Sequence, residues 1–424
     1  MEHIVLQSER LDEKVYVYTH KSGLKIYISP KKGYAKKCAY FAANYGSMDV
    51  FYEHNGEKHE IPDGLAHFLE HKLFESEEGD AFTKYAKTGA SANAFTSFGC
   101  TAYYFTCSNR FYENLKILTD LMQTPYFTPE NVAKEQGIIG QEINMYLDAP
   151  DWRVYQNMLE AMYHTCTVRR DIAGSVESIS HITDTLLYDC YNMYYAPENM
   201  VLVIAGDVDP EETALEAEKL LSKMEYRKAP KKVYPGEEKS VLKPYTEQKL
   251  SVSFPIYMLG FKGERAKDGE DIIRREIIGK TAAGVLFGRS SRFYLDAYDA
   301  GLINDNFDCD YEICENYAHL IIMGEGEKYE TVKNKIFETV RNAAENGISD
   351  EEFTRRLNLL RSGFIKSFNS VETVARNFMD AKFGGYDLYE YAETFDKVTK
   401  DDILKFIKEE MAEDRSVLSV ILPK

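Results

Sequence analysis

Hydrophobic residues follow two spacings along the first half of the chain, one typical of strands and one typical of helices. Runs rich in β-branched and aromatic residues at 15–18, 24–29 and 38–44 are separated by turn residues, which predicts three strands. Residues 61–74 then change to the three- and four-residue spacing of a helix. Further strands are expected at 102–107 and 201–205, and further helices at 114–122 and from an N-cap at Thr128 to about residue 146.

The same order of elements recurs in the second half. Residues 226–249 are rich in Lys and Pro and have no apolar period, so they are predicted to form a linker. Strands are then expected at 250–257, 318–323 and 416–422, and helices at 271–286, 329–344 and 350–368. We therefore predict two copies of one α+β plan, domains at residues 1–225 and 250–424.

Composition and charge exclude several classes of protein. The 424 residues include 51 Lys and Arg against 69 Asp and Glu, a net charge of −18, which argues against a chain that coats nucleic acid or anionic lipid. No stretch approaches 18 uncharged apolar residues, and the first residues lack the apolar core of a signal peptide, so no membrane association is expected. Seven scattered Cys without a C-x-x-C pair do not form a disulfide framework. We expect a cytoplasmic protein.

The clearest chemistry lies inside the helix predicted at 61–74. His67 and His71 are four residues apart, so both imidazoles leave the same helix face and can converge on one ion. Glu70 lies beside that face, in the order H-x-x-E-H, where it can act as a general base without binding the metal. Two His and a Glu among Leu and Phe side chains need polar partners, which favours metal binding over a chance spacing.

A hydrolytic zinc site needs a third protein ligand and one open position for water. The helix that begins after Thr128 offers Glu135 and Glu142, which are seven residues apart and so lie on one face. Taken alone, these are more readily two solvated carboxylates on an amphipathic helix.

Together these residues resemble the M16 family of zinc metallopeptidases, the pitrilysin-like inverzincins, and most closely its short single-half members of the processing-peptidase-like type. That family follows H-x-x-E-H after about seventy residues with E-x6-E, and here Glu142 lies 71 residues after His71 (142 − 71). Other segments that resemble family motifs are Asn93, Ala94, Phe95 and Thr96 with Thr101 and Tyr103, residues 174–183, residues 195–200 and residues 201–207.

The resemblance implies a fold, an activity and a set of roles. The fold would be α+β, with two similar α/β-sandwich domains, each an antiparallel-rich sheet with helices on one face, forming half of a clamshell. The activity would be zinc-dependent endopeptidase cleavage of peptides or unfolded segments inside a chamber. The implied roles are one Zn²⁺ per chain held by His67, His71 and Glu142, general base catalysis by Glu70, catalytic support by Glu135, and addition of the substrate as an extra strand along Asn93, Ala94, Phe95 and Thr96.

The chain departs from the family pattern at three positions. Ala297 and Asn304 stand where family members carry an Arg and a Tyr that grip the substrate, and Gly99 stands where an acidic residue is common. The missing donors could come from a second subunit. We therefore expect a homodimer, or a heterodimer with an M16-like paralogue that supplies the Arg and the Tyr.

Two other functions stay open. The chain could be a catalytically silent peptide-binding or scaffold subunit of a heteromeric complex, although a scaffold need not retain the general base. The metal could also be structural, which would require a fourth protein ligand such as His54 or His59.

Overall fold

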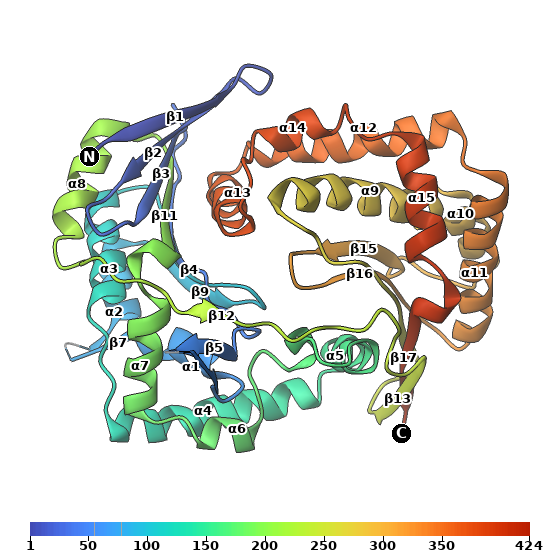
Figure 1. Cartoon of the computed structure of the whole chain (residues 1–424), viewed down its shortest axis with the longest axis horizontal. Coiled ribbons are helices and arrows are strands. Elements are labelled where there is room, and N and C mark those ends of the chain that lie inside the picture. The colour runs from blue at the N-terminus through green and yellow to red at the C-terminus, as the bar shows by residue number, and fades with distance from the viewer. Residues whose placement is uncertain (55, 78) are drawn as a thin grey trace.

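Strands from the first half of the chain form one seven-stranded sheet (Figure 1). The computed structural model describes residues 1–54, 56–77 and 79–424, without the side chain of His54. In spatial order the strands are β1 (His3–Ser8), β2 (Glu13–Thr19), β3 (Lys25–Pro30), β11 (Met200–Gly206), β4 (Lys37–Ala43), β10 (Thr101–Cys107) and β9 (Ser91–Thr96). β11 runs parallel to β3, and the other neighbouring strands are antiparallel. The five strands predicted in this half are confirmed to within a residue or two.

Strands from the second half form a five-stranded sheet together with a strand at 245–250, which corrects the end of the predicted linker. Their spatial order is β13 (Tyr245–Leu250), β17 (Ser416–Pro423), β14 (Ile256–Lys262), β16 (Ala318–Glu325) and β15 (Asp308–Ile313). The single strand predicted at 250–257 is wrong, because β13 ends at Leu250 and β14 begins at Ile256. Pro255 lies between them and has no N–H to offer to a ladder. Smaller sheets contain β5 (Phe51–His54), β6 (Glu57–Glu60) and β12 (Lys231–Lys232), and β7 (Glu75–Ser76) and β8 (Gly79–Asp80).

Helices cover both faces of each large sheet, because each half of the chain contributes one helix that packs on the sheet of the other half. α5 (Pro150–Met162) comes from the first half but packs on β13, β14 and β17. α13 (Val371–Gly384) comes from the second half but packs on β4 and β11. The strand β11 is buried on both faces, which explains its unbroken apolar sequence. The predicted α+β class is confirmed, and the exchange adds a covered face that the sequence did not predict.

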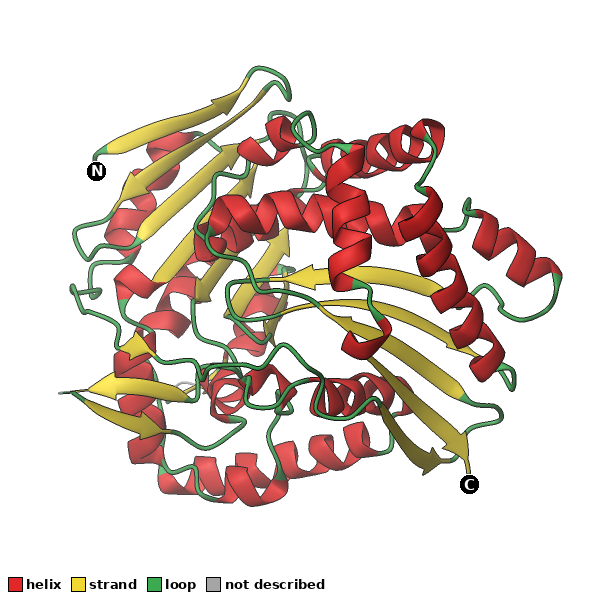
Figure 2. Cartoon of the chain, turned by 45° about the vertical axis from the view of Figure 1, so that its right-hand side comes forward, coloured by secondary structure: helices red, strands yellow, loops and turns green. Residues whose placement is uncertain are grey.

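The remaining helices surround the sheets (Figure 2). Over the described residues, none of them has the length and apolar composition that a membrane crossing requires. They are α1 (Leu65–Leu73), α2 (Ala81–Thr88), α3 (Phe111–Gln123), α4 (Pro129–Leu147), α6 (Val176–Ser180), α7 (Asp184–Tyr194), α8 (Pro210–Leu220), α9 (Gly269–Phe287), α10 (Arg292–Asp299), α11 (Tyr329–Asn346), α12 (Asp350–Ser367), α14 (Glu390–Thr394) and α15 (Lys400–Glu410).

The starts of α1 and α4 have clear local causes. The Thr128 hydroxyl accepts a hydrogen bond from the Asn131 amide, so the predicted N-cap of α4 is confirmed. α1 begins four residues later than predicted, after Gly64, whose φ of 87° is in the left-handed region. A side chain on Gly64 would also lie 2.3 Å from the carbonyl oxygen of Ala173, so the close approach of these two segments requires glycine.

Glu237, inside the predicted linker, ties that segment to both halves. Its carboxylate accepts hydrogen bonds from the backbone amides of His164, Thr165 and Cys166 at 2.7–2.9 Å. It also pairs with the Lys262 ammonium on β14 at 2.5 Å. Burial raises the pKa of Glu237, but these hydrogen bonds outweigh burial and lower it to about 2.

We expect Glu237→Gln to lower the free energy of unfolding by about 2 kcal/mol at pH 7. The pKa of this carboxyl is depressed on folding, so its contribution is complete above the ordinary value of 4.5 and disappears as the pH falls toward 2. Urea unfolding of both proteins at pH 7 and pH 3 measures the difference, which should shrink at pH 3. Equal stabilities at pH 7 would contradict this account.

Candidate metal centre

Helix α1 presents its two histidines on one face. The ring centroids of His67 and His71 are 4.6 Å apart, and the ring planes meet at 65°. Leu65, Phe68 and Leu69 anchor the opposite face in the core of the first sheet. His67 is 8% exposed, and burial together with the neighbouring His71 lowers its pKa to about 3. The His67 ring is therefore neutral at physiological pH, which is the form that binds metals.

Helix α4 brings Glu142 to this pair. One carboxylate oxygen lies 3.8 Å from Nε2 of His67, and the other lies 3.4 Å from Nε2 of His71. Within the described part of the chain, these three residues form the one group of His, Cys, Asp and Glu side chains close enough to share an ion. Atoms bound about 2.0–2.2 Å from one tetrahedral zinc ion are roughly 3.3 Å apart, so the donor set fits this metal.

Glu135 lies seven residues before Glu142, on the same face of α4, and its side chain supports His71. Its carboxylate lies 3.0 Å from Nδ1 of His71, which leaves Nε2 of that ring turned toward Glu142. Burial lowers the pKa of His71, but the hydrogen bond with Glu135 and the charge of Glu142 outweigh it and raise the pKa. The carboxylates of Glu135 and Glu142 thus both favour positive charge at His71.

Lys72 is a component of the site that the sequence analysis missed. It is fully buried, its ammonium lies 3.8 Å from the other oxygen of Glu135, and it pairs with Glu75. The signal was a Lys between His71 and Leu73 on a predicted core-packed helix, because a buried ammonium needs carboxylate partners.

Glu70 lies beside the three clustered side chains and does not belong to their group. Its carboxylate accepts a hydrogen bond of 2.6 Å from the Thr96 hydroxyl on β9. The Thr96 hydroxyl lies 3.4 Å from that of Thr101, which in turn donates to the carbonyl oxygen of Tyr45. Burial raises the pKa of Glu70, and the hydrogen bond from Thr96 opposes that rise. The carboxyl is thus moved toward the range in which a general base works near neutral pH.

The four predicted substrate-binding residues lie on β9, the last strand of the seven-stranded sheet. Thr96 is the member that contacts Glu70. The Asn93 side chain accepts from the Ala94 amide at 2.9 Å, and the Phe95 ring lies 4.9 Å from the Arg376 guanidinium. The strand therefore offers one free edge that ends beside the candidate base.

A cavity of about 610 Å³ opens between the two halves next to this edge. The β9–β10 turn contributes Ser97 and Gly99 to its wall, and β15 contributes Asp310 and Glu312. Gly99, the position that departs from the acidic pattern, therefore faces a space in which acidic side chains come from the other half.

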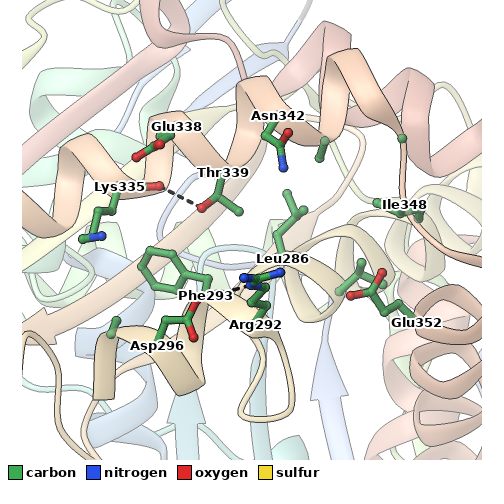
Figure 3. Close-up of a pocket in the computed structure, with 14 residues that line it drawn as sticks. Leu286, Arg292, Phe293, Asp296, Lys335, Glu338, Thr339, Asn342, Ile348 and Glu352 are labelled. Carbon is green, nitrogen blue, oxygen red and sulfur yellow. Dashed lines mark hydrogen bonds and ion pairs between the residues drawn. The ribbon is translucent and has the colours of Figure 1, made fainter. Parts of the chain in front are cut away.

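Ala297 and Asn304 lie in the second half, which contributes no described residue to the metal group. Ala297 on α10 is 3% exposed and packs in the core of the second half. The Asn304 amide donates to Glu325 at 2.7 Å. α10 and α11 border a separate cavity of about 420 Å³. Figure 3 shows the side chains that line it. In Figure 1 these helices lie at the opposite end of the molecule from α1.

Neither of the two histidines considered as a fourth metal ligand, His54 and His59, belongs to the metal group among the described residues. His59 stacks on Tyr52, with ring centroids 5.1 Å apart, and the metal group does not include it. The side chain of His54 lies outside the described part of the structure.

Comparisons with known proteins give this geometry a family. Residues 52–176 match the model "Insulinase (Peptidase family M16)", and residues 181–360 match "Peptidase M16 inactive domain". The uncharacterized zinc protease YmfH of Bacillus subtilis is 38% identical over 99% of each chain. The metal group thus lies in the first matched region, and the second carries the name of an inactive domain.

Solved structures extend the similarity to the whole fold. The crystal structure of an M16-like peptidase from Alicyclobacillus acidocaldarius is 32% identical, covers 99% of this chain and 100% of its own, and has a TM-score of 0.94. The periplasmic protease PqqL of Escherichia coli is 16% identical with a TM-score of 0.76, over 99% of this chain and 48% of its own, a likeness in fold alone. The chain therefore belongs to peptidase family M16, as a half-clamshell α+β member of single-half length.

Proposed function

We propose that this protein is a zinc-dependent endopeptidase with one Zn²⁺ per chain. The observation that carries the proposal is the convergence of His67, His71 and Glu142 within 4.8 Å of one another, with Glu70 beside them. Relatives described as zinc proteases support the choice of metal. Three protein ligands leave one position open, which is typical of hydrolytic rather than structural zinc.

The side chains of the site divide the chemistry among them. When bound, zinc acts as a Lewis acid that acidifies water and polarises the scissile carbonyl. Glu70 takes the proton of the attacking water and returns it to the leaving amine. Glu135 holds the ring of His71 in the orientation that turns Nε2 toward Glu142. Lys72 holds Glu135 in turn.

The substrate is a peptide or unfolded segment that adds to the free edge of β9. Backbone hydrogen bonds along Asn93, Ala94 and Phe95 give affinity with little sequence selectivity, and Thr96 lies where this edge reaches Glu70. The adjoining cavity of about 610 Å³ supports an enclosed path for such a chain.

A second subunit completes the site. Ala297 and Asn304 cannot donate hydrogen bonds to a substrate as Arg and Tyr would. The side chain of Ala297 is buried in the core, and the amide of Asn304 already donates to Glu325. The partner is a second copy or an M16-like paralogue that carries the Arg and the Tyr. Peptidase activity of the purified chain, alone and mixed with such a paralogue, tests this, and full activity of the monomeric chain alone would contradict it.

A catalytically silent peptide-binding subunit is the second candidate function. The departures at Ala297 and Asn304 favour it. Retention of Glu70 with its hydrogen bond from Thr96 favours the enzyme, because peptide binding alone does not use a general base.

We expect Glu70→Gln to lower kcat on model peptides by about 1,000-fold while the zinc content stays at one per chain. Glutamine keeps the size of the side chain but cannot accept the proton. Product analysis by mass spectrometry and metal analysis of the same samples measure both quantities. Undiminished cleavage would contradict the assignment of Glu70, and a metal that is lost with Glu70 would make this residue a ligand.

Glu135→Gln should weaken zinc binding by about 10- to 100-fold, because an amide holds the ring of His71 less firmly than a carboxylate. Competition with a chromophoric chelator measures the dissociation constant. Glu130→Gln, an exposed change in the first turn of the same helix, is the matched control and should leave the constant unchanged. Equal affinities in both variants would remove Glu135 from the site.

Thr96→Val should shift the acidic limb of the kcat/KM profile to higher pH by about one unit. The Thr96 hydroxyl opposes the rise that burial imposes on the pKa of Glu70, so its removal raises that pKa further. Rates measured from pH 4 to pH 8 locate the limb. Ser91→Ala at the exposed start of β9 is the control, and an unmoved limb in Thr96→Val would contradict the assignment.

A further inference from the structure

Helix α4 presents a third polar side chain on the face that carries Glu135 and Glu142. Tyr146 follows Glu142 by four residues, so their side chains are neighbours on the helix surface. The two side chains share a hydrogen bond, and the Tyr146 hydroxyl also lies close enough to Glu70 to be affected by its charge. The chemistry proposed above does not use this hydroxyl, although it interacts with a candidate metal ligand and with the candidate base.

The Tyr146 hydroxyl is the donor in this hydrogen bond. Burial raises its pKa above the ordinary value of 10, and the charge of Glu142, the hydrogen bond to it and the charge of Glu70 raise the pKa further. The phenol is therefore protonated at neutral pH. A carboxylate has acceptors only, so the proton of the hydrogen bond comes from Tyr146. The carboxylate that lies 3.8 Å from Nε2 of His67 and 3.4 Å from Nε2 of His71 thus has a donor one turn further along its own helix.

Trp152, the one tryptophan of the chain, contacts the ring of Tyr146. The two ring centroids are 5.5 Å apart, and the ring planes meet at 42°. Nε1 of Trp152 donates to one carboxylate oxygen of Asp171 at 2.9 Å, and the other oxygen accepts from the Ala173 amide at 3.0 Å. Asp171 therefore fixes the indole, and the indole limits the movement of the phenol ring beside it.

The segment that fixes Trp152 also contacts the start of helix α1. In this segment the Arg170 guanidinium donates to the Asp63 carboxylate at 2.8 Å. The carbonyl oxygen of Ala173 lies so close to Gly64 that a side-chain carbon there would be 2.3 Å away. The indole is thus positioned against the helix that carries the two histidines, and the phenol ring that it contacts is positioned with it.

We propose that Tyr146 is a positioning residue for the metal centre, whose hydroxyl holds the Glu142 carboxylate toward the two histidines. A flexible glutamate side chain loses rotamer freedom when it binds an ion, and a hydrogen bond formed beforehand lowers that cost. Carboxylates that bind metals are themselves hydrogen-bonded for this reason. Tyr146 does for Glu142 what Glu135 does for His71. This role rests on the metal centre of the proposed function but not on peptide cleavage.

Tyr146→Phe tests the hydroxyl alone, because phenylalanine retains the ring that contacts Trp152. In a titration of the metal-free full chain against a chelator of known affinity, this variant should bind zinc about 10- to 100-fold more weakly than the natural chain. Its circular dichroism spectrum should stay that of the natural chain. Tyr298→Phe, which removes the hydroxyl of a 44% exposed ring on α10, is the matched control and should bind zinc as the natural chain does.

The possible failures of this test have different meanings. Equal zinc affinities of Tyr146→Phe and the natural chain would overturn the role of Tyr146 and would leave the metal centre standing. A natural chain that binds no zinc would overturn the metal centre and this role with it.

A double-mutant cycle tests whether Trp152 acts through Tyr146. Trp152→Leu removes the ring beside the phenol and should weaken zinc binding of the natural chain by about threefold or more. In the Tyr146→Phe background no hydroxyl remains to be held, so the same change should have no further effect on zinc affinity. An equal loss in both backgrounds would show that Trp152 acts on the fold as a whole and would overturn its part in holding Tyr146.

Discussion

The contact between α1 and α4 is the constraint on which the rest of the molecule depends. It places two imidazoles, two glutamates and a lysine in a largely apolar setting, where each group would be costly without a partner. The hydrogen bond between His71 and Glu135, and the ion pairs of Lys72, supply partners for three of these groups, whereas Nδ1 of His67 is buried without a hydrogen-bond partner among the described residues. The same arrangement leaves two Nε2 atoms and the Glu142 carboxylate facing one point. The contact that pairs His71 with Glu135 thus also sets the geometry of the metal group.

The exchanged helices extend this constraint to the second half. α4 ends at Leu147 and α5 begins at Pro150, so the helix that carries Glu142 continues almost at once into a helix packed on the other sheet. In the opposite direction, α13 of the second half packs on β4 and β11 of the first sheet. Glu237 adds a further tie, because it joins the segment after α5 to Lys262 on β14. The position of Glu142 is thus linked to the second sheet, although that sheet contributes no residue to the metal group as described.

The positions of many helices and strands could be predicted from the sequence, because short-range patterns of apolar and capping residues determine them. Apolar runs located β2, β3, β4, β10 and β11, and the N-cap residue Thr128 located the start of α4. The predicted boundaries of helices and strands were wrong where contacts between segments distant in the sequence set them. The start of α1 depends on the approach of Ala173 to Gly64, and Pro255 divides a run that looked like one strand. The helix exchange leaves no local signal, because α5 and α13 are ordinary amphipathic sequences.

In the candidate site, too, features set by local sequence could be predicted and features set by distant contacts could not. The spacing of His67 and His71 on one helix face was readable, because it is local. Glu142 could not be distinguished from a solvated carboxylate by spacing alone, since its partners are some seventy residues away in the sequence. The resemblance of the sequence to a peptidase family supplies that link. The burial of the Lys72 ammonium was not predicted, because it depends on the packing of α1 against α4, which brings Glu135 close to it.

X-ray absorption spectroscopy at the zinc edge of the reconstituted chain tests the central claim most directly. The account predicts imidazole scattering from two histidines and light-atom ligands at about 2.0–2.2 Å, with a total coordination number of about four. Sulfur ligands at about 2.3 Å, or a coordination sphere without imidazole, would contradict it.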